Sequence, residues 1–256
     1  MNGVIADEVR IETRGAVREA DVARVRAKIA GVTRFASAPV LFVRIRLSVL
    51  RGQGAVAQAN VDVNGRPVRV QATGATMGEA IAELGERLRR RLERLARLRE
   101  HRTGPRPPAN GRGGERAHRR DLPSHAYRMP GSRWLTRHKT FALRQETVAE
   151  AAEDMYLLDY AFHLFTESGS GQDSVLYRDG SSYRLAQIAP DPAHITQTGM
   201  PFSISPVPAA HLDVPDALAH LDQAGMPFVF FADATTGRGS MVYRRVDGNY
   251  GLIEVA

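Results

Sequence analysis

The second half of the chain repeats itself, and this repeat constrains the fold more than any other feature. A shift of 66 residues superimposes apolar and aromatic positions: Val148 on Val214, Ala151 on Ala217, Met155 on Leu221, Phe162 on Phe228, Phe165 on Phe231 and Tyr177 on Tyr243. Each copy has only about 50 residues, and a domain of that size buries too little surface to be more than marginally stable alone. We therefore expect the two copies to pair with each other.

Each copy is predicted to have the element order βαβββ. The expected first strand and helix lie at 140–143 and 148–158 in copy 1, and at 203–207 and 214–224 in copy 2. The last two strands of each copy meet at Asp179-Gly180 or Asp247-Gly248, pairs that favour a two-residue hairpin turn. We place copy 1 at 134–189, a short linker at 190–203 and copy 2 at 204–256.

The first hundred residues, assigned to one domain at 1–100, predict a different order, βαβββα. Apolar and polar residues alternate in the strands, which is typical of a sheet with one buried face. Asn64-Gly65 supplies a hairpin signal. The expected elements are a strand at 9–12, a helix at 17–36, strands at 41–50, 57–63 and 68–72, and a helix at 76–99. This is an α+β domain with two helices on one face of a four-stranded sheet.

Residues 101–133 lose all periodicity and join the two halves. They hold five glycines, five prolines and eight arginines, a composition that cannot bury a core, so we expect a basic disordered linker. Charge also divides the chain. Residues 1–100 carry 19 Arg or Lys against 11 Asp or Glu, whereas residues 134–256 carry 8 against 15. The front of the chain therefore suits a polyanion, and the back would be repelled by one.

The expected helix at 76–99 carries a row of arginines opposite its apolar stripe. An exposed helix face usually interleaves both signs of charge, and acidic partners look sparse here, so we favour a phosphate-binding face over a merely solvated one. The row consists of Arg87, Arg90, Arg94 and Arg97, flanked by Arg91. Arg24 and Lys28 of the first helix would widen it. No base-reading motif is present, so any RNA contact should be to phosphate and shape.

Signals for catalysis and for metal binding are weak. The chain has no cysteine, and its eight histidines form no metal-binding motif, so we expect no catalytic residue, metal or cofactor. Gly169-Ser170-Gly171 lacks the rest of a phosphate loop and is interpreted as an ordinary loop. The apolar runs are too short to span a membrane, and no secretory signal is visible, which predicts a cytoplasmic protein.

The end of the chain resembles a known family. The hairpin sequence VYRRVDGNYGLIE at 242–254 is similar to the closing motif of long-form ribosome hibernation promoting factors, also called sigma-54 modulation or ribosomal subunit interface proteins. The preceding Phe228-Val229-Phe230-Phe231 and the spacing of Arg137, Lys139 and Phe141 fit as well. The first hundred residues match by topology and by their arginine-rich last helix.

The resemblance implies a non-enzymatic factor that binds the 30S subunit and the 70S ribosome in the path of mRNA and of the A- and P-site tRNAs, inhibiting translation. It also implies that the arginine row, with Arg24 and Lys28, contacts 16S rRNA. In the family, the C-terminal domain forms homodimers that join two 70S particles into a 100S particle. No membrane or small-molecule partner is implied, and the acidic half would contact itself or a ribosomal protein.

This chain departs from the family pattern by carrying two C-terminal copies. We expect the copies to pair within one chain, because their short tether keeps them at high effective concentration, and so to silence single 70S particles in dormancy or stress. The expected pairing residues are Phe162, Phe165, Tyr177, Phe228, Phe230, Tyr243 and Tyr250. The alternatives are a hibernation factor that forms 100S particles, and a different RNA-binding or transcription-linked stress regulator.

Overall fold

The computed structural model describes residues 9–50, 54–103, 133–196, 198–245 and 248–255. The predicted linker therefore lies outside the described residues, apart from its ends. The chain forms two compact units: 1–110 with 156–159, and 111–155 with 160–256. Within the described residues, no helix is long and apolar enough to cross a membrane.

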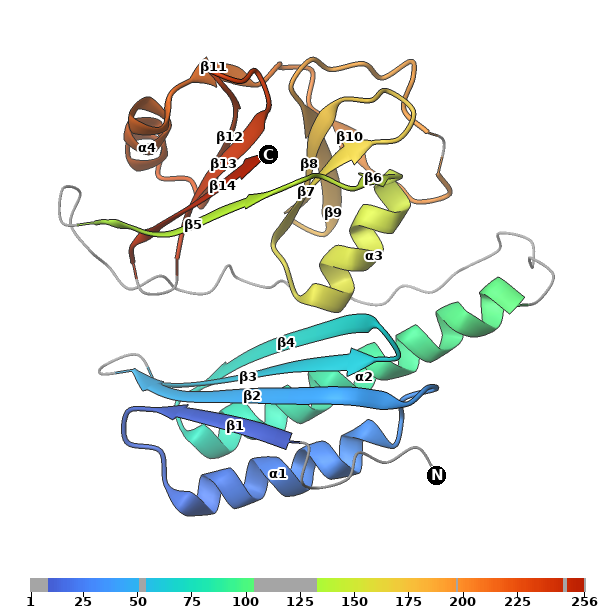
Figure 1. The fold of residues 1–256 in the computed structure, drawn as a ribbon, viewed down its shortest axis with the longest axis vertical. Coiled ribbons are helices and arrows are strands. Elements are labelled where there is room, and N and C mark those ends of the chain that lie inside the picture. The colour runs from blue at the N-terminus through green and yellow to red at the C-terminus, as the bar shows by residue number, and fades with distance from the viewer. Residues whose placement is uncertain (1–8, 51–53, 104–132, 197, 246–247, 256) are drawn as a thin grey trace. The chain divides into compact units, whose positions relative to one another are not determined.

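The first unit has the predicted βαβββα order. Its elements are β1 (Val9–Arg14), α1 (Glu19–Thr33), β2 (Val40–Leu50), β3 (Gly54–Val63), β4 (Arg66–Gly74) and α2 (Met77–Thr103). The sheet order is β1-β2-β3-β4, with β1 parallel to β2 and the other neighbours antiparallel. Both helices cover the same face of this sheet (Figure 1), as the sequence predicted.

Alternation explains why these strands form where they do. In β2, Val43, Ile45 and Leu47 are fully buried, and their neighbours face the other side of the sheet. The turn between β3 and β4 is the predicted hairpin: Asn64 and Gly65 both have positive φ, 52° and 82°, the combination that a type I′ turn requires.

The second unit contains two five-stranded sheets, one centred on each copy. Copy 1 supplies β5 (Leu135–Phe141), β6 (Gln145–Glu146), α3 (Val148–Leu158), β7 (Phe162–Glu167), β8 (Asp173–Asp179) and β9 (Ser182–Gln187). Copy 2 supplies β10 (Ser203–Ile204), β11 (Ala210–Leu212), α4 (Val214–Gln223), β12 (Phe228–Asp233), β13 (Gly239–Arg244) and β14 (Tyr250–Val255). The two helices begin at the predicted residues.

The copies exchange their first strands. The sheet orders are β10-β9-β8-β7-β6 and β11-β12-β13-β14-β5, so β5 of copy 1 lies parallel to β14 of copy 2 (Figure 1). In return, β10 of copy 2 pairs with β9 of copy 1.

This exchange corrects the predicted first strands. Where the sequence indicated one strand at 140–143 and one at 203–207, each copy has two short strands, one in each sheet. Gly180 and Gly248 have the positive φ expected at the hairpin turns, 62° and 80°, while Asp247 lies outside the described residues.

Candidate nucleic-acid interface and pairing surface

Two arginines of α2 reach the open edge of the sheet. Arg87 Nη1 donates to the carbonyl of Gln71 at 2.9 Å, and Arg91 Nη1 donates to the carbonyl of Arg69 at 2.8 Å. Both acceptors lie on β4, the edge strand of this sheet, and no strand among the described residues bonds its outward carbonyls. Arg87 and Arg91 therefore fasten α2 to this edge, a role that the sequence pattern did not indicate.

Arg90 and Arg97 are exposed on the outer side of α2, and Arg94 lies one turn from each. Acidic partners are less sparse than the sequence suggested. Glu83 lies 2.5 Å from Arg87 Nε and 4.0 Å from Arg90 Nη2. The expectation that the row has few acidic partners was therefore wrong at Arg87 and Arg90. The net positive charge of the outer side of α2 increases from these residues toward Arg97.

Arg24 and Lys28 of α1 lie against α2 at two of its glycines. A Cβ on Gly78 would stand 2.8 Å from Arg24 Nη1, and one on Gly85 would stand 2.1 Å from Lys28 Cε. Lys28 Nζ donates to Glu86 Oε1 at 3.4 Å, a hydrogen bond that lowers the pKa of Glu86. The two α1 cations thus meet α2 on the flank of its glycines, not on the flank that reaches β4.

The face of the first sheet opposite α1 and α2 is also rich in arginine. Arg46 Nη2 donates to Glu12 Oε2 at 2.8 Å, and Arg44 Nε lies 3.6 Å from the other carboxylate oxygen. The hydrogen bond from Arg46 is the main cause of a lowered pKa at Glu12. On the same face, Arg69 of β4 donates to the side chain of Gln71 at 2.9 Å.

The loop Gly169-Ser170-Gly171 already holds a negative charge of its own. Glu167 is fully buried, and its Oε2 accepts from the backbone N–H groups of Gly169 and Ser170 at 3.0 and 2.7 Å. Burial by itself would raise the pKa of Glu167, but these N–H groups and that of Thr196 lower it overall. A carboxylate thus fills the place that a bound phosphate would need, which agrees with an ordinary loop.

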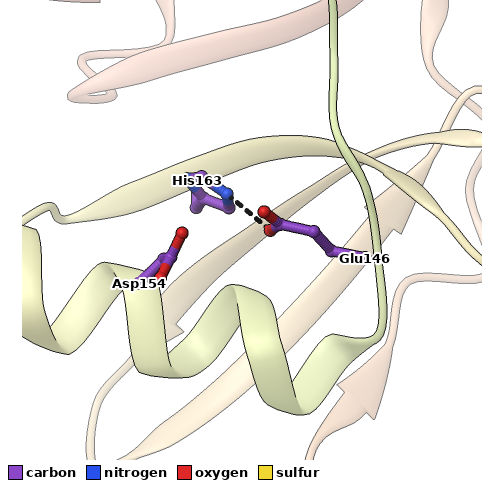
Figure 2. Close-up of side chains that lie close together, drawn as sticks. All are labelled: Glu146, Asp154 and His163. Atoms are coloured by element: carbon purple, nitrogen blue, oxygen red, sulfur yellow. Dashed lines mark hydrogen bonds and ion pairs between the residues drawn. The ribbon is translucent and has the colours of Figure 1, made fainter. Parts of the chain in front are cut away.

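Figure 2 shows three titratable side chains that the sequence gave no reason to group: Glu146, Asp154 and His163. Their ligand atoms lie within 4.8 Å of one another, and His163 Nε2 is 2.9 Å from Glu146 Oε2. Such a set could hold a metal ion. However, Arg144 Nη1 lies 3.0 Å from Glu146 and 3.1 Å from Asp154, so its charge already offsets both carboxylates. The cluster serves as an ion network that ties β6 and α3 to β7.

The inner faces of the two sheets in the second unit share one apolar cluster. Its buried members are Leu164 and Val175 of copy 1 and Met241 and Val255 of copy 2. Aromatic rings from both copies pack against them. The ring centroid of Phe162 lies 5.2 Å from that of Phe228 and 5.6 Å from that of Tyr243, while Tyr177 lies 5.3 Å from Phe228. Phe230 belongs to the same cluster.

Two of the seven expected pairing residues lie elsewhere. Phe165 is fully buried in the core of copy 1 beneath α3, and Tyr250 is buried in the core of copy 2 beneath α4. Strand geometry gives the reason for Phe165, since successive side chains point to opposite faces. Phe162 and Leu164 face the other copy, so Phe165 must face its own helix.

Tyr250 instead joins a polar cluster in copy 2. Its hydroxyl donates to Asp222 Oδ2 at 2.5 Å, and Asp222 also pairs with Arg133 at the start of the described second unit. Burial and the bond to Asp222 raise the pKa of Tyr250. The cluster anchors the chain entering β5 to α4 and β14.

Asp173 joins the copies by polar contacts. This residue is 7% exposed and accepts hydrogen bonds from Arg238 Nε at 2.8 Å and from the backbone N–H of Gly239 at 2.9 Å. Burial would raise the pKa of Asp173, but the bonds from Arg238 and Gly239 lower it overall. The sequence repeat indicates this contact, because the 66-residue shift superimposes Asp173 on Gly239.

Comparison with known proteins finds a family and several relatives. Residues 132–185 and 205–252 each match the family described as Sigma 54 modulation/S30EA ribosomal protein C terminus, once in each copy. A protein of Mycobacterium tuberculosis named dormancy associated translation inhibitor is 31% identical over 223 residues, which cover 82% of this chain and 74% of the relative.

Two solved structures resemble the chain over a shorter stretch. The N-terminal domain of Thermus thermophilus Protein Y is 24% identical, covers 34% of this chain and 98% of its own, and has a TM-score of 0.31. A ribosomal subunit interface protein from Coxiella burnetii is 17% identical, covers 34% of this chain and 94% of its own, and has a TM-score of 0.29.

Proposed function

Because this chain belongs to the sigma-54 modulation/S30EA family of long-form ribosome hibernation factors, we propose that it binds idle ribosomes in the cytoplasm and inhibits translation. The first unit would occupy the path of mRNA and of the A- and P-site tRNAs on the 30S subunit. The relative from Mycobacterium tuberculosis, named for dormancy and for translation inhibition, supports this role.

The contact with 16S rRNA would be made by α2 and α1 through phosphates. Arg90, Arg97 and Arg24 are the favoured residues, because all three are exposed. Guanidinium groups bind phosphate in a bidentate manner, and each phosphate contact releases counterions. Arg87, Arg94 and Lys28 would add to this surface. Arg91, predicted as a member of the row, is only 1% exposed and pairs with Asp159, so its role would be to hold the sheet edge. Binding should therefore weaken steeply as salt rises.

The second unit would keep each ribosome single. The observation that carries this part of the proposal is the packing of Phe162 against Phe228, with Tyr177 and Tyr243 completing the cluster. These rings come from both copies of one chain, so the face that would otherwise bind a second chain is covered. The exchange of β5 and β10 supports the same pairing. We propose that the chain silences 70S particles without joining them into 100S particles.

A ribosome co-sedimentation assay tests the rRNA contact. The variant Arg90→Glu/Arg97→Glu should lose binding to purified 70S ribosomes at moderate salt, because it places like charge against phosphate. The control is Arg184→Glu, which reverses the charge of one arginine on the acidic second unit. It should bind as the unchanged chain does. Normal binding by the double variant would contradict the proposed face. Equally tight binding to free RNA would favour a general RNA-binding regulator instead.

A further inference from the structure

The two copies are related by an approximate twofold axis. The 66-residue shift that aligns the repeat maps the contact of Phe162 with Tyr243 onto that of Phe228 with Tyr177, and both contacts are present. A residue that touches its own repeat equivalent must lie on the axis. Phe162 and Phe228 do so, with ring centroids 5.2 Å apart.

A second pair of equivalents meets on the axis, and here the copies differ. Asp173 and Gly239 are superimposed by the repeat, and a Cβ on Gly239 would stand 2.8 Å from the Cβ of Asp173. Two side chains cannot approach that closely, so the axis has room for one. Copy 1 supplies that side chain, and copy 2 supplies the glycine whose N–H donates to it.

The residue before this position also differs between the two copies. Arg238 of copy 2 donates to Asp173 through Nε at 2.8 Å and Nη2 at 3.3 Å. Its equivalent in copy 1 is Gln172, which carries no charge. Copy 1 therefore presents a buried carboxylate at the axis, and copy 2 presents the guanidinium and the backbone N–H that receive it.

We propose that the two copies carry complementary pairing surfaces, so that each recognises the other and rejects a second copy of its own kind. This inference rests on the proposed pairing and adds the rule that selects the partner. The partner that fits copy 2 is a sheet of the same fold with a carboxylate on the axis.

A pair of two identical copies would lack the contacts of Asp173 that stabilise the pair of copy 1 with copy 2. In a pair of two copies 1, the side chains of two Asp173 residues would meet at the axis with too little space, no cation and like charge. In a pair of two copies 2, the N–H of Gly239 would lose its acceptor in both subunits, and an unpaired buried donor is unfavourable. Joining two chains through copy 2 alone is therefore disfavoured relative to pairing with copy 1.

Cysteine cross-linking of the full chain tests this rule, because the natural chain has no cysteine. In the variant Phe162→Cys/Phe228→Cys, the new thiols face each other across the axis. We expect an intramolecular disulfide under mild oxidation, detected by mass spectrometry. Each single variant should remain a monomer on a non-reducing gel, since no self-pair brings two identical positions together.

The outcomes separate the rule from the pairing in one chain. A covalent dimer of the Phe228→Cys single variant would show that copy 2 pairs with itself, and would overturn the proposal. Disulfides formed only when the two single variants are mixed would support the rule but contradict pairing within one chain. Failure of the double variant to form any disulfide would overturn both.

Changes at the axis give a second test in the same double-cysteine chain. Gly239→Asp places a second carboxylate against Asp173, and disulfide formation should slow on the order of a hundredfold. Exchanging the whole set, with Gln172→Arg, Asp173→Gly, Arg238→Gln and Gly239→Asp together, should restore most of the rate because it mirrors the axis. An unchanged rate for Gly239→Asp, or no recovery in a mirrored chain that circular dichroism shows to be folded, would overturn the proposal.

Discussion

Substituting Gly251 by alanine should destabilise the second unit by forcing an aromatic ring out of place. A Cβ at this position would stand 2.3 Å from Cζ of Tyr243 and 2.6 Å from its Cε1. The φ of Gly251 is not positive, so alanine can adopt the backbone and the effect is steric. Overpacking costs about 1–3 kcal/mol, and losing the edge contact of Tyr243 with Phe162 costs about 0.5–1.5 kcal/mol. We expect a loss of about 2–4 kcal/mol in the free energy of unfolding.

Urea denaturation of the full chain measures this loss. Trp134, the single tryptophan, reports on the second unit because its carbonyl accepts from the N–H of Tyr250 at 3.0 Å. Gly199→Ala, where a Cβ would meet nothing within 4 Å, is the matched control. In a Tyr243→Ala background, Gly251→Ala should have almost no further effect. A change below about 0.5 kcal/mol for Gly251→Ala alone, the size of an ordinary surface substitution, would refute the steric reasoning.

Three further results are expected. Glu167→Gln should lower the free energy of unfolding by about 1–3 kcal/mol in urea denaturation, since it weakens the acceptor for two backbone N–H groups. Because the pKa of Asp173 is lowered in the fold, its contribution to stability is present above about pH 4 and is lost as pH falls through the lowered pKa. Asp173→Asn should therefore lose less stability than the unchanged chain in thermal unfolding between about pH 5 and pH 2.5. Arg97→Glu should reduce the salt dependence of ribosome binding, with a smaller slope of log affinity against log salt.

The sequence predicted most of the fold because one face of nearly every strand is buried. The alternation around Ile45 identified β2, and helical spacing identified α3 at the residues where it begins and ends. The alternation of side chains along a strand also places Phe165 in the core of copy 1, because it lies an odd number of residues from Phe162 and so faces the opposite side.

Other features had no local signal. The exchange of β5 and β10 joins strands far apart in the chain, and the local sequence of a strand does not specify which sheet it joins. The bonds of Arg87 and Arg91 to β4 depend on how α2 crosses the sheet edge. From their spacing alone, both arginines belong to a charged row on α2. In the structure they donate to backbone carbonyls of β4.

The most direct test of the account is sedimentation of purified 70S ribosomes through a sucrose gradient, with and without this protein, probing each fraction for the chain. We predict that the chain migrates with 70S particles and that no heavier peak forms. A new 100S peak that contains the chain would contradict pairing of the two copies within one molecule. A chain that remains at the top of the gradient even at low salt would contradict ribosome binding itself.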